Sequence, residues 1–267
     1  MHNVQYGTGT PILILHGFCV DHRFLLALDP AFAAEGQWRR VYIDLPGMGG
    51  SHAGPEIESA DAVAKAVVEF ARDTFQNEKF AIFGSSFGGM IARHLAAEFG
   101  EQILGLALLC PVAVAEPSDR ALPPKTVLQA DPRLLESLDA EDARDYAETA
   151  VIQSPENWSR FRTAVLPGLR AFDQEVVSRI INKYSLTVEP ESVSASFQRP
   201  TLIISGRQDN VVGFEDQIAL SASYPRSTIA VLDNAGHNAH LDQPEMVNSL
   251  IREWLARVEC DKSSECG

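Results

Sequence analysis

The chain has 267 residues, of which 45% are hydrophobic, and it carries a formal net charge of −14. This length allows one sizeable core. The acidic surface repels phosphate backbones and anionic lipid headgroups, so we expect neither nucleic-acid nor membrane partners. No apolar window approaches the length of a membrane span, and no basic segment precedes an apolar stretch at the N-terminus. We therefore expect a cytoplasmic protein.

Short apolar runs alternate with helical patterns along most of the chain. Near-continuous apolar runs are typical of parallel strands that are covered on both faces. The predicted strands are 12–15, 41–43, 80–83, 103–109, 201–204 and 228–232. The predicted helices are 60–75, 90–99, 214–223 and 244–258. This order predicts an α/β fold with a mostly parallel, doubly wound sheet flanked by helices.

The alternation stops over residues 114–196, where amphipathic helical patterns are separated by prolines. We interpret this segment as an inserted helical cap, with residues 1–113 and 197–267 forming the core. Such an insertion would lie over the carboxyl ends of the strands, where open α/β sheets bind ligands. The alternative is an ordinary structural excursion without a role in binding.

The cysteines give a weak argument about redox chemistry. Cys19 and Cys110 lie in or beside apolar segments, which indicates small buried residues. Cys260 and Cys266 lie in the polar tail 259–267, which we expect to be frayed. These two could pair, but nothing requires it. No C-x-x-C motif occurs, so zinc and thioredoxin-like sites have no support.

Residues 84–88 read Gly-Ser-Ser-Phe-Gly, between a predicted strand and a predicted helix. A strand that breaks at a glycine and restarts as a helix turns too sharply for a Cβ two residues before or after its central serine. This context favours a nucleophile elbow with Ser86 exposed on the turn. The alternative is a Gly/Ser loop that matches the pattern by chance.

A serine nucleophile needs a histidine that accepts its proton. His237 lies just after the strand 228–232, in a loop where this base belongs, while His240 follows closely and could compete. His94 falls within the helix after the elbow, so we expect it to be packed or exposed. The histidines of the early segments are His2, His16, His22 and His52.

The histidine in turn needs a carboxylate that holds it. Asp209 follows the strand 201–204, whereas the segment after the preceding strand has no carboxylate before Glu116. Asp209 is therefore the predicted acid. Asp216, in a predicted helix, and Asp233, at a strand end, are alternatives, and Asp209 could also be only a loop-capping residue.

Two backbone N–H groups should stabilise the developing oxyanion. The N–H of Phe87 lies at the start of the helix after Ser86. The N–H of Phe18 belongs to the loop after the first strand, which Gly17 allows to turn, and the Phe18 side chain should line an acyl pocket. His16 is better interpreted as a residue that organises this loop.

Together these segments resemble the α/β-hydrolase superfamily over the whole chain except the cap. His16-Gly17-Phe18 is similar to its oxyanion loop, residues 44–51 to the turn after the next core strand, and residues 84–89 to its elbow. Residues 206–209 and 236–237 resemble its acid and histidine loops, in the superfamily's own order.

Two departures from the family pattern stand out. The first strong strand begins near Pro11, so one or both of the usual N-terminal edge strands should be missing or very short. Met48 stands where relatives often carry a polar or basic residue, and we expect it to alter the entrance to the site.

The resemblance implies a carboxylesterase-like serine hydrolase with a Ser-His-Asp triad and no cofactor, acting on a small or medium acyl compound. Carboxylic esters are the leading substrates. Carbon–carbon bond hydrolysis of ring-cleavage products, lactonase and thioesterase activities remain alternatives, as does a ligand receptor with slow or no turnover. A ring-cleavage dienoate is anionic, and its candidate partners are Arg160, Arg162 and Arg170, which could equally be surface charges.

A metal site is a weaker alternative. His237 and His240 are spaced as two ligands on one side of a helical turn would be. No second cluster with ligand spacing accompanies them, so we expect no metal.

Overall fold

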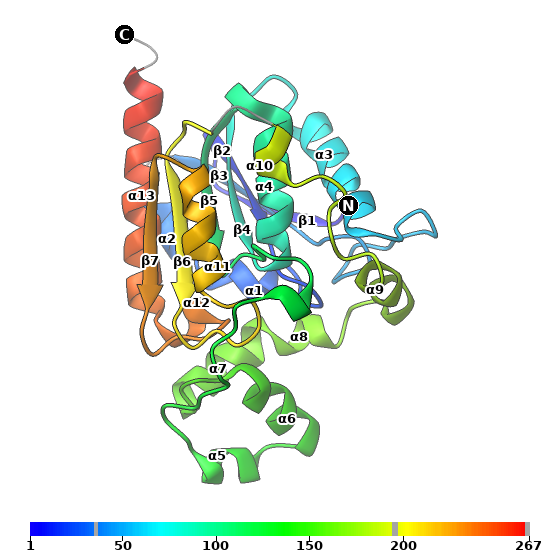
Figure 1. Cartoon of the computed structure of the whole chain (residues 1–267), viewed down its shortest axis with the longest axis vertical. Coiled ribbons are helices and arrows are strands. Elements are labelled where there is room, and N and C mark those ends of the chain that lie inside the picture. Colours follow the sequence, from blue (N-terminus) through cyan, green and yellow to red (C-terminus); the bar gives the residue numbers. More distant parts are fainter. Residues whose placement is uncertain (35–36, 194–196, 265–267) are drawn as a thin grey trace.

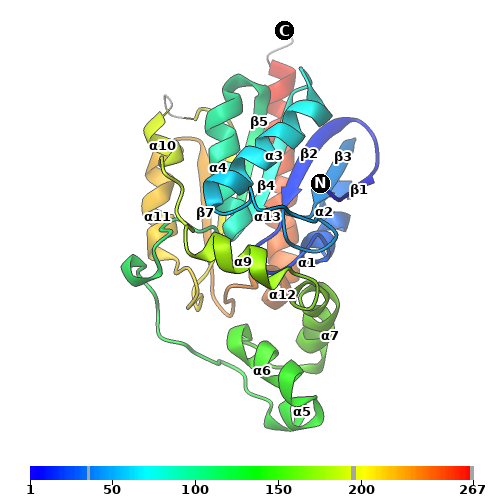
Figure 2. The ribbon, with the colours of Figure 1, turned by 90° about the vertical axis from the view of Figure 1, so that its right-hand side faces the viewer.

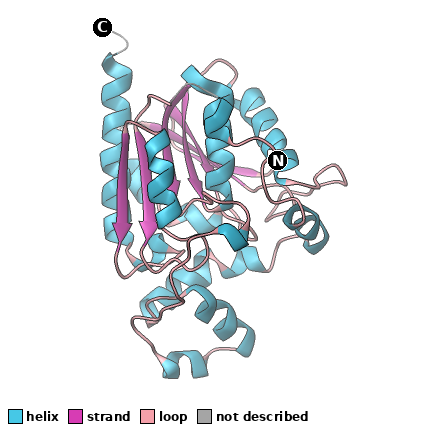
Figure 3. Ribbon diagram, in the orientation of Figure 1, coloured by secondary structure: helices cyan, strands magenta, loops and turns pink. Residues whose placement is uncertain are grey.

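The computed structural model describes residues 1–34, 37–193 and 197–264. One seven-stranded sheet lies at its centre, with helices on both sides (Figure 3). The strands follow the spatial order β1-β3-β2-β4-β5-β6-β7, and only the β1–β3 pair is antiparallel. Their bounds are β1 Asn3–Tyr6, β2 Thr10–Leu15, β3 Trp38–Ile43, β4 Phe80–Ser85, β5 Ile103–Leu109, β6 Thr201–Gly206 and β7 Ser227–Leu232.

The central strands are buried on both faces, as their apolar runs predict. Every residue of β4, β5 and β6 is buried. Helices α3, α4 and α11 cover one face of the sheet, and α2 and α13 cover the other (Figure 1). The core helices are α1 Arg23–Leu26, α2 Asp29–Ala34, α3 Ala60–Phe75, α4 Phe87–Phe99, α11 Glu215–Leu220, α12 Ala239–Asp242 and α13 Pro244–Ser264. The predicted α/β class and mostly parallel sheet are confirmed.

The N-terminal edge of the sheet is short, in agreement with the sequence. β1 has four residues and pairs with β3. At the other end of the chain, the expectation of a frayed tail is wrong for residues 259–264, because α13 continues to Ser264. Lys262 donates a hydrogen bond to the hydroxyl of Thr10 at 2.6 Å and so ties this last turn to the sheet. Cys266 lies outside the described residues, as does its pairing with Cys260.

Between β5 and β6 the chain forms a helical insertion, whose first helices lie at the carboxyl ends of the strands and whose last helix lies beside α4 (Figures 1 and 2). Its helices are α5 Pro132–Ser137, α6 Ala140–Thr149, α7 Pro155–Ala164, α8 Leu166–Leu169, α9 Gln174–Ile181 and α10 Pro190–Val193. Tyr146, Trp158 and Phe161 pack their rings together and give α6 and α7 a common apolar core. Within the described ranges, no helix combines the length and the hydrophobicity that crossing a bilayer requires.

The returning limb of the insertion, residues 174–191, is bonded to the core at several points. Arg179 donates to the carbonyl of Gly54 at 3.1 Å, and Lys183 pairs with Glu58 at 2.9 Å. The N–H of Ala60 donates to the carbonyl of Lys183 at 2.9 Å. These contacts hold the returning limb against the start of α3.

Candidate active site

Ser86 lies on a sharp turn between β4 and α4, with φ 52° and ψ −119°, a conformation uncommon for a residue with a side chain. A Cβ on Gly84 would lie 2.4 Å from the carbonyl oxygen of Gly88. A Cβ on Gly88 would lie 2.3 Å from the carbonyl oxygen of His16. Close backbone packing therefore requires both glycines, and the turn has the geometry of a nucleophile elbow.

Ser86, His237 and Asp209 form a continuous chain of hydrogen bonds. His237 Nε2 lies 3.0 Å from Ser86 Oγ, and His237 Nδ1 lies 2.9 Å from Asp209 Oδ2. Because an ionised carboxylate only accepts, this arrangement favours a proton on Nδ1 and leaves Nε2 to accept the serine proton. The three residues come from the loops after β4, β6 and β7, where their sequence positions predict them.

Asp209 is fully buried and is held by its own loop. Its Oδ1 accepts hydrogen bonds from the N–H groups of Val211 and Val212, at 2.9 and 3.0 Å. The other oxygen is thereby directed at His237. The rival acids have other partners, since Asp216 accepts from the N–H of Ala121 and Asp233 accepts from the Gln208 side chain.

The rival histidines are engaged in structural contacts. His240 is buried and donates through Nε2 to the carbonyl of Phe24 at 3.0 Å, and burial lowers its pKa to about 3. His16 donates through Nδ1 to the carbonyl of Gly17 and accepts through Nε2 from the N–H of Leu45. Burial lowers the pKa of His16 as well, so it is a neutral ring that joins two loops.

Two sets of described side chains are close enough to share a metal ion. In one, His2 and His22 each place Nδ1 within 2.8 Å of a different oxygen of Asp44. Burial raises the pKa of Asp44, but hydrogen bonds from His22 and from the N–H of Gly50 outweigh it and leave the pKa well below its usual range. These hydrogen bonds account for the cluster without an ion.

The other set is Asp209 and His237 with Cys110. Cys110 is buried, its Sγ lies 3.7 Å from the carbonyl of Gly236, and burial raises the pKa of its thiol. A protonated thiol packs as a small apolar residue and is a poor metal ligand. This agrees with the structural role predicted for Cys110.

Gly17 brings the loop after β2 against the nucleophile. A Cβ at this position would lie 3.2 Å from the Cβ of Ser86. The Phe18 ring packs edge-on against Phe87, with centroids 5.2 Å apart, and Tyr184 of the insertion packs against both rings. Phe87 is the first residue of α4, where N–H groups have no acceptor within the helix. The oxyanion role of the two N–H groups stays a prediction.

Ser86 and His237 line a cavity of about 600 Å³ between the core and the insertion. Phe18 and Val212 lie in the core wall, as expected for Phe18, and the segments 115–117 and 181–185 contribute from the insertion. Sequence reasoning missed Arg120 and Tyr184 as wall residues. Tyr184 lies within the segment 114–196, whose amphipathic patterns predict helices but not which side chains face a ligand, and Arg120 lies in an irregular stretch that gave no signal.

One expectation about the entrance needs correction. Met48 is fully buried and is absent from the wall of the cavity, so it does not shape the entrance. Of the two alternatives for Arg160, Arg162 and Arg170, contact with an anionic substrate has no support, because none of the three lines the cavity. Arg170 pairs with Asp142, and Arg160 lies in a separate depression beside α1. The cations in the wall are Arg120 and Lys183.

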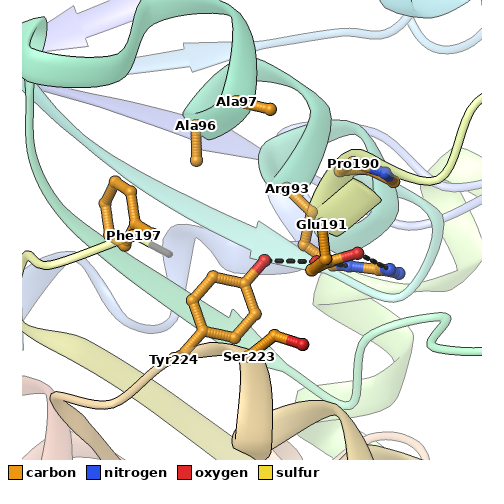
Figure 4. Close-up of a pocket in the computed structure, with 8 residues that line it drawn as sticks. All are labelled: Arg93, Ala96, Ala97, Pro190, Glu191, Phe197, Ser223 and Tyr224. Carbon is orange, nitrogen blue, oxygen red and sulfur yellow. Dashed lines mark hydrogen bonds and ion pairs between the residues drawn. The ribbon is translucent and has the colours of Figure 1, made fainter. Parts of the chain in front are cut away.

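A second, smaller cavity of about 190 Å³ lies beside α4 and α10 (Figure 4). Arg93 of α4 is 2% exposed and donates to both carboxylate oxygens of Glu191, at 2.7 and 2.6 Å. Tyr224 donates to the same carboxylate. Arg93 also donates to the carbonyl of Val112, whose N–H donates to the carbonyl of Ser86. This cavity contains a satisfied ion pair and no residue of the Ser86 site.

The sheet order, the elbow and the loops around it define an α/β hydrolase. The family model of the alpha/beta hydrolase fold matches residues 10–244, and the chain belongs to this family.

Similar proteins span most of the chain. Mouse monoacylglycerol lipase ABHD6 is 25% identical over 265 residues, covering 92% of this chain and 76% of that protein. The AB hydrolase superfamily protein YisY of Bacillus subtilis (strain 168) is 27% identical over 259 residues, covering 93% and 92%. The crystal structure of an alpha/beta superfamily hydrolase from Oenococcus oeni PSU-1 superposes with a TM-score of 0.87 at 28% identity, covering 96% of each chain.

Proposed function

We propose that this protein is a serine hydrolase that cleaves small or medium acyl compounds through an acyl-enzyme, with carboxylic esters as the leading substrates. The observation that carries the proposal is the hydrogen-bond chain from Asp209 through His237 to Ser86, whose last two members line the 600 Å³ cavity. The name of the ABHD6 relatives, monoacylglycerol lipase, describes ester hydrolysis and supports the same substrate class.

In the proposed mechanism, Ser86 Oγ attacks the acyl carbon while His237 Nε2 takes its proton. Asp209 keeps the imidazole in the reactive tautomer and stabilises the imidazolium that forms. The N–H groups of Phe18 and Phe87 stabilise the oxyanion. His237 then protonates the leaving group, and a water molecule activated by the same histidine releases the acid.

The test combines labelling with a matched pair of variants. A fluorophosphonate probe should label Ser86, as read by peptide mass spectrometry. Ser86→Ala should abolish hydrolysis of p-nitrophenyl butyrate, with a loss on the order of a million-fold in kcat. Ser85→Ala is the control, since the neighbouring hydroxyl is buried and has no hydrogen-bond partner in the described structure. Undiminished hydrolysis by Ser86→Ala would place the chemistry elsewhere.

A substrate panel separates the remaining alternatives. It contains esters, thioesters, lactones and a ring-cleavage dienoate, with kcat/KM measured for each. We expect the highest kcat/KM for carboxylic esters. If protein that reacts with the fluorophosphonate probe binds members of the panel but turns none of them over, it acts instead as a ligand receptor.

A further inference from the structure

Arg120 brings a guanidinium group to the wall of the Ser86 cavity. It donates to three backbone carbonyls: Nε to Val114 at 2.9 Å, Nη1 to Val211 at 2.9 Å and Nη2 to Ala115 at 2.8 Å. These bonds hold the side chain in one position. A guanidinium has more N–H groups than these bonds use, so donors remain for a ligand.

The charge of Arg120 is not neutralised by a carboxylate. Its three acceptors are carbonyls, and it forms no ion pair within the described residues. Lys183, the other cation of the wall, pairs with Glu58 at 2.9 Å. Glu116 lies in the same wall, but its carboxylate accepts from the N–H and hydroxyl of Ser118. Arg120 is therefore the cation of this wall that is left for a ligand.

Arg120 also lies close to the reactive end of the cavity. Its acceptor Val211 donates its own N–H to Asp209 and so belongs to the loop that holds the acid. Burial raises the pKa of the Tyr184 hydroxyl, and the positive charge of Arg120 acts against that rise. The same Tyr184 ring packs on Phe18 and Phe87 beside Ser86. Arg120 thus faces the space that a substrate bound at Ser86 would fill.

We propose that Arg120 makes this cavity prefer acyl compounds that carry a carboxylate or another anionic group away from the scissile bond. This inference rests on the proposed function and specifies its substrate class. Arg120 acts as a specificity-determining residue, because its guanidinium neutralises a distant anion and takes no part in the proton transfers. The chain's net charge of −14 repels anions in general, so a local unpaired cation is needed to reverse that repulsion here.

The test compares pairs of esters that differ only in a terminal charge. In one pair, p-nitrophenyl adipate monoester carries a carboxylate where p-nitrophenyl hexanoate has a methyl group. In the other, 3-carboxyphenyl hexanoate and 3-methylphenyl hexanoate place the difference in the leaving group. The measured quantity is the anionic-to-neutral ratio of kcat/KM, which cancels general effects of a substitution on the loop.

Arg120→Gln should lower this ratio at least about tenfold for one of the two pairs, since a hydrogen bond to a charged group is lost. Arg120→Lys should retain part of the preference. Lys183→Gln is the matched control: it removes a cation of the same wall that already has a partner, and should change the ratio less than about twofold. An unchanged ratio in Arg120→Gln would overturn the inference. The role of Arg120 would then be limited to joining two loops through its hydrogen bonds to backbone carbonyls.

A binding measurement separates this inference from the proposed function. In the Ser86→Ala background, monomethyl adipate should bind more tightly than dimethyl adipate by titration calorimetry, and Arg120→Gln should remove the difference. If the native protein hydrolyses no ester but shows this Arg120-dependent binding, the proposed function fails and the inference stands. If the native protein hydrolyses neutral esters but the Ser86→Ala variant binds the two adipates equally, the proposed function stands and the inference about Arg120 fails.

Discussion

Gly17 illustrates how a single residue can determine the position of the nucleophile. The loop after β2 approaches Ser86 so closely that a Cβ on Gly17 would lie 3.2 Å from the serine Cβ and 3.7 Å from its Oγ. The contact between the two Cβ atoms is tight enough that one of the two segments would have to move by a few tenths of an ångström. The reacting hydroxyl would move with it, relative to the imidazole of His237.

Gly17→Ala should therefore lower kcat for ester hydrolysis at least about tenfold, since small misplacements of reacting groups are costly. The unfolding midpoint should change little. Gly54→Ala is the control: its new Cβ would meet only the flexible carboxylate end of Glu56, at 2.3 Å. Steady-state kinetics and thermal unfolding of both variants check this. Equal kinetics in the two variants would contradict the close approach at Ser86.

At the residue scale, the three hydrogen-bonded residues Ser86, Asp209 and His237 could be predicted from the sequence, because each of them follows a recognisable strand. Ser86, Asp209 and His237 lie in loops after β4, β6 and β7, and parallel strands bring such loops to one edge of the sheet. Arg120 could not be predicted in this way. Its position depends on carbonyls of an irregular segment and on Val211, 91 residues away in the chain.

Helix α7 connects the insertion to the loop that carries His237. Asn157 Nδ2 donates to Asp242 Oδ1 at 2.8 Å, and the N–H of Gly236 donates to Asp242 Oδ2 at 2.9 Å. Burial raises the pKa of Asp242 to about 6, although both donors act to lower it. An unfolded aspartate titrates near pH 4. The stability that Asp242 contributes is thus complete below about pH 4 and is lost as the pH rises through about 6.

Asn157→Ala should destabilise the protein more at pH 8 than at pH 5, because the lost hydrogen bond is stronger when its acceptor is the ionised carboxylate than when it is the protonated acid. The expected loss at pH 8 is about 1–3 kcal/mol. Urea unfolding of the wild type and the variant at the two pH values measures the difference. Ser159→Ala, at an exposed position of the same helix, controls for helix propensity. If the loss of unfolding free energy is the same at both pH values, the hydrogen bond from Asn157 does not stabilise the ionised form of Asp242.

At the element scale, long periodic segments were predictable and short ones were not. The bounds of α3 and β5 agree with the patterns in the sequence. α1 and α2 have four and six residues, too few for a helical period to stand out. β1 pairs along one side only and has half of its residues exposed, so it lacks the apolar run of a central strand.

Over the whole molecule, the two limbs of the insertion differ in how firmly they are held. None of residues 121–138 of the outgoing limb is buried. The returning limb, 174–191, buries residues of α9 and bonds to the core through Arg179, Lys183 and Glu191. Local opening is easiest where few apolar contacts are lost.

Hydrogen exchange should therefore be at least about tenfold faster in residues 121–138 than in residues 174–191. Mass spectrometry of deuterium uptake in the native protein resolves the two segments. Fast exchange in the returning limb, or equal protection of both limbs, would contradict the asymmetry of contacts. A substrate that needs the insertion to open would enter from the side of the outgoing limb.

The buried pair of Arg93 and Glu191 sets a condition on recombination between homologous hydrolases. Arg93 belongs to the helix that begins at the nucleophile, whereas its counter-charge comes from the last helix of the insertion. Glu189 lies 3.3 Å from the same guanidinium. A chimera that exchanges the insertion and has no acidic residue at position 189 or 191 leaves a buried cation alone, at a cost of about 3–5 kcal/mol. The graft junction therefore belongs before residue 189, so that the recipient chain keeps the acidic residues that pair with its own Arg93.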